Sequence, residues 1–165
     1  MPQKKICMLG AFAVGKTSLV ARFVRSMFSE KYHTTVGVKI DKKVLQLDGE
    51  DVTLVLWDIA GEDEFQKVRS TYLRGSAGFF FVADGTRPTT LEVVQRLRGI
   101  ALGAVGDVPY MLALNKRDLE AEWELDRSII GELEADGWTV FETSAKSGDN
   151  VEEAFTWLAQ RTVGS

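Results

Sequence analysis

The stretch GAFAVGKT, residues 10–17, decides how the rest of this sequence is interpreted. It matches the pattern G-x-x-x-x-G-K-[S/T] at every constrained position, and chance produces such a match in well under ~1% of chains of this length. The stretch lies between an apolar run of strand length at 4–9 and a segment of helical period at about 16–26. Glycines at both ends allow the backbone to wrap closely, so that consecutive N–H groups converge on an anion at the positive end of the following helix. The sequence therefore predicts a phosphate-binding loop.

The side chains of this loop predict the chemistry of its ligand. Lys16 supplies a point charge to the β- and γ-phosphates of a nucleotide, and the hydroxyl of Thr17 can ligate Mg²⁺. The alternative is a glycine turn followed by an exposed lysine, which the strand–turn–helix setting disfavours. The residues that we expect to contact the nucleotide here are Ala13, Val14, Gly15, Lys16, Thr17 and Ser18.

Apolar runs of strand length alternate with segments of helical period along the chain, a pattern typical of an α/β fold. Six strands are predicted at 4–9, 36–47, 52–57, 78–83, 110–115 and 138–142, and helices at about 16–26, 64–73, 90–102, 126–135 and from about 149. The turn signal LDGED at 47–51 predicts a hairpin, and hence one antiparallel edge strand on a mostly parallel sheet with helices on both faces. The 165 residues contain no linker or repeat, so we expect a single domain over 1–165.

The composition disfavours several classes of function. The net charge is -4 and the chain has no run of lysines or arginines, which disfavours nucleic-acid binding. No stretch reaches the ~18 apolar residues of a transmembrane segment. Cys7 is the only cysteine and lies in an apolar run, so we expect a small core residue rather than a nucleophile. A reducing, cytoplasmic location fits these features.

Two later segments indicate which base the nucleotide carries. Asn115, Lys116 and Asp118 follow directly on the strand residues 110–114, at the end where ligands bind in open α/β sheets. The Asp118 carboxylate can accept hydrogen bonds from N1–H and the 2-amino group of guanine, whereas adenine has neither donor. A buried carboxylate left unpaired would reject adenine by about 10⁴-fold.

The segment ETSAK at 142–146 follows the next strand and favours guanine further. The backbone N–H of Ala145 could donate to guanine O6, the stem of Lys146 could pack on the base, and Ser144 stands beside them. The alternative for each segment alone is an ordinary polar turn before a helix. An ATP-dependent phosphotransferase is a further alternative, but it would leave Asp118 and Ala145 without a purpose.

Together these motifs resemble those of the Ras superfamily of small GTPases, and the likeness covers essentially the whole chain. Five segments occur in the family's order: GAFAVGKT at 10–17, YHTTVG at 32–37, WDIAGE at 57–62, NKRD at 115–118 and ETSAK at 142–146. The segments TVGV and YLRG are similar to T-I-G-V and Y-Y-R-G of Rab-like members. The resemblance implies a G domain that binds GTP or GDP with Mg²⁺, hydrolyses GTP, and acts as a molecular switch under an exchange factor and an activating protein.

Matching positions carry further roles by resemblance. Phe28 would stack on the guanine, and Thr35 would close onto Mg²⁺ and the γ-phosphate. The Gly61 N–H would contact the γ-phosphate, and Asp58 would hold Mg²⁺. The contacts of Thr35 and Gly61 would form when the third phosphate is present and be lost on hydrolysis. The expected metal ligands are therefore Thr17, Thr35 and Asp58, and the expected catalytic residues are Lys16, Thr35 and Glu62.

Two residues depart from the family pattern near the site of hydrolysis. Glu62 stands where the family has a glutamine that orients the attacking water, and a carboxylate cannot donate a hydrogen bond toward the developing phosphoryl charge. Phe12 stands where many members have glycine, and its ring would compete for space beside the γ-phosphate. We expect intact nucleotide binding with slow or atypical hydrolysis. The alternatives are a GTP-binding module with negligible hydrolysis, and a different residue that positions the water.

Apolar residues around the two switch segments suggest a partner site. The residues in question are Val36, Val38, Ile40, Trp57, Phe65 and Tyr72. Some of them must pack the sheet, and a surplus of exposed ones would mark a surface for effectors or regulatory proteins. Rab-like members usually have an aromatic at the position of Ile40, so partner identity does not transfer. The sequence ends at Ser165 without a terminal cysteine for prenylation, so we expect peripheral membrane association only through a tail or partner outside it.

Overall fold

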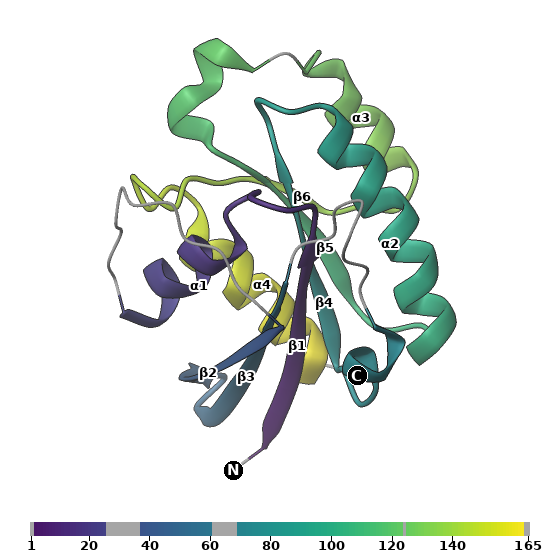
Figure 1. Ribbon diagram of the computed structural model, residues 1–165. Coiled ribbons are helices and arrows are strands. Elements are labelled where there is room, and N and C mark those ends of the chain that lie inside the picture. The colour runs from purple at the N-terminus through teal and green to yellow at the C-terminus, as the bar shows by residue number, and fades with distance from the viewer. Residues whose placement is uncertain (1, 26–36, 61–68, 124, 164–165) are drawn as a thin grey trace.

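The computed structural model describes residues 2–25, 37–60, 69–123 and 125–163, and within these ranges six strands form one sheet (Figure 1). The strands are β1 (Gln3–Gly10), β2 (Val38–Leu47), β3 (Glu50–Ile59), β4 (Gly78–Asp84), β5 (Tyr110–Asn115) and β6 (Val140–Glu142). Their order across the sheet is β2-β3-β1-β4-β5-β6. All neighbours pair in parallel except β2 and β3, so β2 is the predicted antiparallel edge strand. The predicted fold class is confirmed.

Helices cover both faces of the sheet (Figure 1). On one face lie α1 (Lys16–Arg25) and α4 (Val151–Val163), and on the other lie α2 (Thr89–Val105) and α3 (Ser128–Ala135). Alternate residues of β4 enter the two cores: Phe80 packs on the α1 and α4 side, and Phe79 and Phe81 pack on the opposite side. Cys7 is buried in the second core, as predicted. Within the described ranges, no helix combines the length and the apolar character needed to cross a bilayer.

The β2–β3 hairpin turns more tightly than the sequence pattern predicts. β2 ends at Leu47 and β3 begins at Glu50, so only Asp48 and Gly49 form the turn. Both have positive φ, 52° and 80°. Two consecutive residues with positive φ are typical of a type I′ turn, whose twist matches that of the flanking strands.

Two predicted elements differ in the structure. The segment predicted as helix at 64–73 lies partly outside the described residues. In its described part, Arg69 is extended and a 3-10 helix, η1 (Ser70–Leu73), follows. The strand predicted from residue 138 begins at Val140, because the Trp138 N–H donates to Leu133 O at the end of α3 instead of joining the sheet. A second 3-10 helix, η2 (Arg117–Glu122), was not predicted.

Candidate nucleotide-binding site

Five strands end at the same edge of the sheet and carry the predicted site. β1, β3, β4, β5 and β6 run parallel, so the loops that follow them meet at their carboxyl ends. In open α/β sheets this edge is where ligands bind. The described residues among those predicted to bind nucleotide or metal lie in α1, in β3, at the end of β5 or in these loops.

The phosphate loop packs tightly against β4 and β5. A Cβ on Gly10 would lie 2.5 Å from Val82 O, and a Cβ on Gly15 would lie 2.3 Å from Asn115 Nδ2. Gly15 also has a φ of +101°, and Ala13 adopts a positive φ of 64° although it is not a glycine. Only glycine satisfies both the space and the backbone angle at position 15. The two glycines of the motif therefore allow the close approach that the sequence predicts.

Lys16 is a buried cation at the start of α1. Lys16 is only 6% exposed. Burial lowers the pKa of Lys16 from its ordinary value of 10.5, and attraction to the Asp58 carboxylate partly offsets this effect. None of the ion pairs found in the described part of the chain involves Lys16. A buried ammonium is costly without a counter-charge, and the helix terminus beside it favours an anion.

Hard oxygen ligands gather beside this cation. Thr17 Oγ1 donates to Asp58 Oδ2 at 2.6 Å, and Asp58 is 1% exposed. Magnesium in nucleotide sites binds one or two protein oxygens together with phosphates and water. A hydroxyl and a buried carboxylate in contact fit that donor set, although the described residues contain no cluster of three acidic, histidine or cysteine ligands. Thr35, the third predicted ligand, lies outside the described residues.

Two residues at the end of β5 connect the base side of the site to the phosphate loop. Asn115 Nδ2 donates to Val14 O at 2.9 Å, and Thr143 Oγ1 donates to Asn115 Oδ1 at 3.2 Å. Lys116 has a left-handed backbone, with φ of 72°, and its Nζ donates to Ala13 O at 3.4 Å. The side chains of Asn115 and Lys116 therefore hold the phosphate loop directly.

The groups predicted to recognise guanine lie together. Ser144 Oγ donates to Asp118 Oδ1 at 2.8 Å, so the loops after β5 and β6 meet at the carboxylate. Asp118 is exposed, whereas Ser144 and Ala145 are buried. In the described part of the chain, the Ala145 N–H donates to no other protein group. A buried N–H without a protein acceptor is uncommon, and it stands where the sequence predicts a donor to guanine O6.

The structure adds three site residues that the sequence motifs do not indicate. Asp84, at the end of β4, is fully buried, and its Oδ2 lies 2.7 Å from Lys116 Nζ. Arg87 Nη1 donates to Phe12 O at 2.8 Å, and Arg22 of α1 donates to the loop after β6. A carboxylate that ends a buried strand was a usable signal for Asp84, but no sequence pattern pointed to either arginine.

Several predicted residues lie outside the described ranges: Phe28, Thr35, Gly61 and Glu62 in the site, and Val36 and Phe65 in the apolar cluster. Their predicted roles stay predictions. Phe12 is described and 38% exposed, so its ring stands at the surface of the phosphate loop while its carbonyl is held by Arg87.

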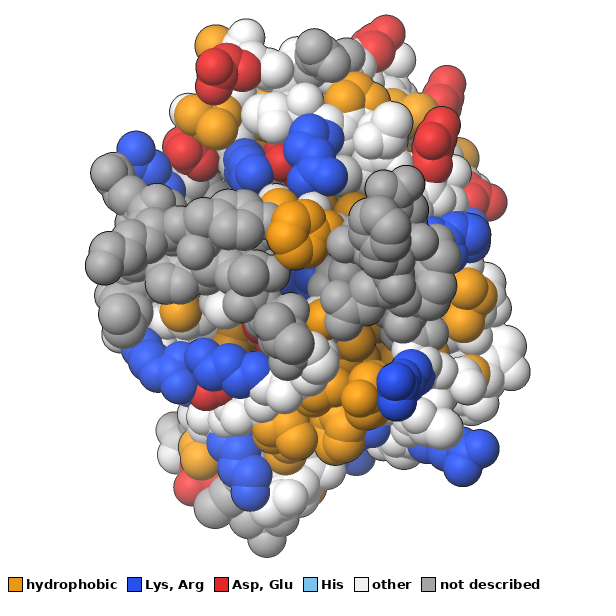
Figure 2. Space-filling model, viewed as in Figure 1, with side chains coloured by type: hydrophobic (Ala, Val, Ile, Leu, Met, Phe, Trp, Pro, Cys, Tyr) orange, Lys and Arg blue, Asp and Glu red, His pale blue; other side chains and the backbone are white. Residues whose placement is uncertain are grey.

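The apolar cluster predicted near the switch segments is partly exposed. Ile40 on β2 is 49% exposed and pairs with Trp57 on β3. Val38, Trp57 and Tyr72 are partly buried against the core on the α2 side. Figure 2 shows hydrophobic side chains gathered on this view of the molecule, flanked by lysines and arginines. Packing against the core therefore buries only part of this cluster, and Ile40 in particular stays exposed to solvent.

Comparisons with known proteins identify the family of this chain. The sequence model of the Ras family matches residues 5–163. The Ras-related protein Rab-13 of Canis lupus familiaris is 34% identical over 158 residues, which cover 94% of this chain and 78% of that protein. The Ras-related protein Rab-8B of Homo sapiens is 34% identical over 158 residues, covering 94% of this chain and 76% of its own length. The Ras-related protein YPTC6 of Chlamydomonas reinhardtii is 34% identical over 153 residues, covering 92% and 71%. The chain belongs to the Ras family and is a Rab-like small GTPase.

Proposed function

We propose that this small GTPase is a switch that holds GTP or GDP with Mg²⁺ at the carboxyl ends of its strands and hydrolyses GTP slowly. The buried Lys16 is the observation that carries this proposal. It begins α1 directly after the loop whose glycines pack closely against β4 and β5, and it has no ion-pair partner among the described residues. Nucleotide phosphates would supply the missing negative charge.

The roles of the other residues follow from their places around this cation. Thr17 and Asp58 would hold Mg²⁺, which neutralises charge on the β- and γ-phosphates when bound. Asp118 would accept hydrogen bonds from the guanine N1–H and 2-amino group. The buried Ala145 N–H would donate to O6, with Ser144 fixing the orientation of the Asp118 carboxylate. Thr35, Gly61 and Phe28 complete the proposed contacts by resemblance.

The slow rate rests on two side chains. Glu62 would accept a hydrogen bond from the attacking water, but it adds negative charge beside the anionic γ-phosphate, which raises the barrier in a partly desolvated site. Phe12 keeps its ring at the surface of the phosphate loop and its backbone held by Arg87. A ring there would hinder an arginine supplied by an activating protein. A GTP-binding module with negligible turnover is the alternative, and the same two residues favour it.

Competition binding of GDP against ADP to nucleotide-free protein, with Mg²⁺ present, tests the site. We expect GDP to be preferred, because adenine offers no N–H donor to the Asp118 carboxylate and turns its N1 lone pair toward it; since Asp118 is exposed and also accepts from Ser144 Oγ, the ~10⁴-fold preference of a fully buried site is an upper limit. Equal affinity for the two nucleotides would refute the proposed site, and identifying the nucleotide that copurifies gives an independent check.

Single-turnover hydrolysis tests the slow rate. Intrinsic hydrolysis by Ras itself is on the order of 10⁻⁴ s⁻¹, and we expect this protein to be slower. Glu62→Gln and Phe12→Gly should raise its rate, whereas Glu64→Gln, the same substitution two residues along, should not. A wild-type rate equal to that of Ras, with no gain from either variant, would show that Glu62 and Phe12 do not limit hydrolysis. No measurable phosphate release over hours would favour the binding-module alternative.

Regulatory and effector proteins are the proposed partners. The exposed part of the apolar cluster, above all Ile40, would form their docking surface near the switch segments. The predicted cytoplasmic location is part of the same proposal. Ile40→Asp should weaken effector binding without changing GDP affinity, because Ile40 lies on β2, outside the phosphate and base loops.

A further inference from the structure

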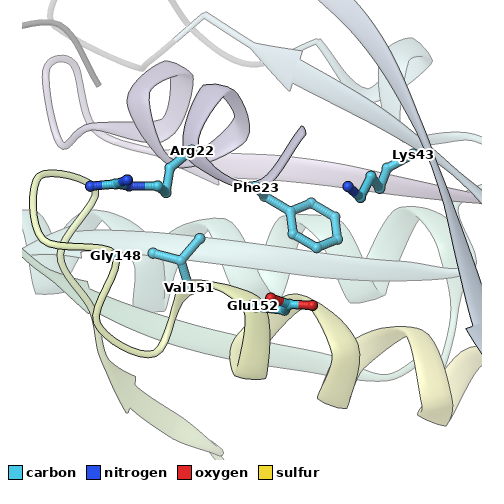
Figure 3. Close-up of a pocket in the computed structure, with 6 residues that line it drawn as sticks. All are labelled: Arg22, Phe23, Lys43, Gly148, Val151 and Glu152. Carbon is cyan, nitrogen blue, oxygen red and sulfur yellow. The ribbon is translucent and has the colours of Figure 1, made fainter. Parts of the chain in front are cut away.

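A single guanidinium on α1 holds the loop that follows β6. Arg22 Nε donates to Ala145 O at 2.8 Å, and Arg22 Nη2 donates to Lys146 O. Figure 3 shows the Arg22 side chain extending away from Phe23 and toward the loop that carries Gly148. Charge-assisted hydrogen bonds of this kind are about twice as strong as neutral ones. Arg22 therefore connects the helix that begins at the phosphates with the loop proposed to contact the base.

The loop is shaped around this guanidinium. Gly148 has a φ of +87°, and a Cβ there would lie 3.5 Å from Arg22 Nε and 3.6 Å from Arg22 Cζ. The Gly148 N–H closes the turn by donating to Ser144 O at 2.8 Å. The turn over 144–148 therefore packs along the side of the guanidinium, in addition to accepting its hydrogen bonds.

Aromatic packing holds α1, the helix that carries Arg22, against α4 and β4. The Phe23 ring stacks on Phe155 of α4 with centroids 4.2 Å apart and planes 5° apart, and Phe155 also stacks on Phe80 of β4 at 4.2 Å. A hollow of about 170 Å³ beside this stack is lined by Arg22, Phe23, Lys43, Gly148, Val151 and Glu152 (Figure 3). The backbone of Arg22 is thus fixed by aromatic packing, while its guanidinium reaches the loop along one wall of the hollow.

Anchoring the carbonyls orients the amides of the same loop. In a planar trans peptide the C=O and N–H bonds point in opposite directions. The two carbonyls held by Arg22 face α1 and share their peptide units with the N–H groups of Lys146 and Ser147. The Ala145 N–H belongs to the preceding unit, whose carbonyl, Ser144 O, is held in turn by the Gly148 N–H. The preceding N–H, that of Ala145, is buried and donates to no protein group in the described ranges. Without the guanidinium, nothing else in the described part donates to the carbonyl of Ala145.

We infer that Arg22 is a positioning residue for recognition of the purine O6. Its two bonds fix the loop after β6 so that the Ala145 N–H is presented to O6 of the base. This inference rests on the proposed function, because it assigns the means by which that site selects guanine. Arg22 itself touches neither the base nor the phosphates in this assignment; it acts through the loop.

Titration calorimetry of nucleotide-free protein with three nucleotides tests the inference. GDP has O6, N1–H and the 2-amino group, IDP has O6 and N1–H without the 2-amino group, and 2-aminopurine riboside 5′-diphosphate has the 2-amino group with neither O6 nor N1–H. We expect R22Q to weaken the binding of GDP and IDP by about tenfold, the effect of losing one ordinary hydrogen bond. The affinity for the analogue without O6 should be nearly unchanged. R161Q is the matched control, because it removes a guanidinium that lies over the Trp157 ring on α4, away from the loop. We expect it to change none of the three affinities.

Equal weakening of all three nucleotides by R22Q would show a merely structural role and overturn the inference, as would an unchanged affinity for GDP. Should R22Q fail to fold, R22K is decisive, because an ammonium cannot reproduce the planar fork that holds two carbonyls. An unchanged ratio of IDP to 2-aminopurine affinity in R22K then overturns the inference. Wild-type protein that binds ADP as tightly as GDP would overturn the proposed function itself. If the wild type is selective for guanine and R22Q has the same three nucleotide affinities, only the role of Arg22 is overturned.

Discussion

Replacing Asp84 by asparagine should uncouple the base side of the site from its buried anchor. Asp84 is fully buried, and its Oδ2 lies 2.7 Å from Lys116 Nζ. Its other oxygen accepts from the N–H and the hydroxyl of Thr86 at 2.8 and 2.7 Å. Asparagine has the same shape and keeps an oxygen for Thr86. The substitution therefore removes one charge and turns an amide NH₂ toward the ammonium of Lys116.

The expected cost lies between two limits. Removing one partner of a fully buried ion pair costs about 3–5 kcal/mol, and exposed pairs are worth about 0.2–1 kcal/mol. The Lys116 side chain is 33% exposed, so its ammonium recovers part of its hydration when the partner is lost. We therefore expect Asp84→Asn to lower the free energy of unfolding by about 2 kcal/mol, or the melting temperature by roughly 6 °C for a domain of this size.

Urea unfolding of the single variants and of the double variant Asp84→Asn, Lys116→Gln measures this interaction. The double-mutant cycle should give a coupling energy of about 2 kcal/mol, because both single changes remove the ion pair between Asp84 and Lys116, whereas the longer pair of Asp84 with Arg87, at 4.0 Å, is lost only with Asp84 and cancels in the cycle. Asp107→Asn, on the exposed loop before β5, is the control and should change stability by less than about 0.5 kcal/mol. A coupling energy below about 0.5 kcal/mol would refute the assignment of Asp84 as the anchor of Lys116.

Three further predictions concern the phosphate side of the site. Gly15→Ala should lower the free energy of unfolding, measured in urea, by about 2–4 kcal/mol, since its Cβ would displace the Asn115 amide. Gly75→Ala is the control: its φ is also positive but the space around it is open, so it should cost about 1 kcal/mol. Equal losses of stability in the two variants would contradict a clash between a Cβ at position 15 and Asn115. Because burial lowers the pKa of Lys16, the unfolded chain binds more protons between that lowered pKa and 10.5, so nucleotide-free protein should gain stability as pH rises through this window. Lys16→Met should abolish that gain in thermal melts at increasing pH while weakening GDP binding, and a gain that persists would exclude Lys16 as its source. Chelation by EDTA should accelerate GDP release from wild type but not from Thr17→Ala, whose release should already be fast; an unaltered EDTA effect in the variant would argue against Thr17 as a ligand.

The parts of the fold and site that depend on local sequence could be predicted. Strand β4 is buried along its whole length, and its uninterrupted apolar run indicates this directly. The phosphate loop could be predicted because its glycines are needed at fixed spacing: a Cβ on either would meet Val82 O or Asn115 Nδ2. Asp118 and Ser144 could be placed together because parallel strands end at one edge.

The parts that depend on side chains meeting across the fold could not be predicted. Asp84 reaches Lys116 because Asp84 pairs with Asn115 in the register of β4 and β5, and the sequence does not specify that register. Arg22 and Ala145 are 123 positions apart, and only the packing of α1 against α4 brings them together. Tryptophan is favoured in strands, but the N–H of Trp138 donates to Leu133 O at the end of α3 instead of pairing with a neighbouring strand.

The contacts between the loops suggest a division of labour within the site. Asn115 holds the Val14 carbonyl, Lys116 holds the Ala13 carbonyl, and Arg22 holds the loop that carries Ala145. The phosphate and base halves are thus joined by the protein itself, so ordering them need not consume binding free energy when a nucleotide enters. A preassembled half of this kind would make the proposed contacts with the base and β-phosphate whether or not a third phosphate is present. Differential contacts are required for a ligand to shift a conformational equilibrium. A difference between the GTP and GDP states must therefore arise where the γ-phosphate is contacted, which by resemblance means Thr35 and Gly61.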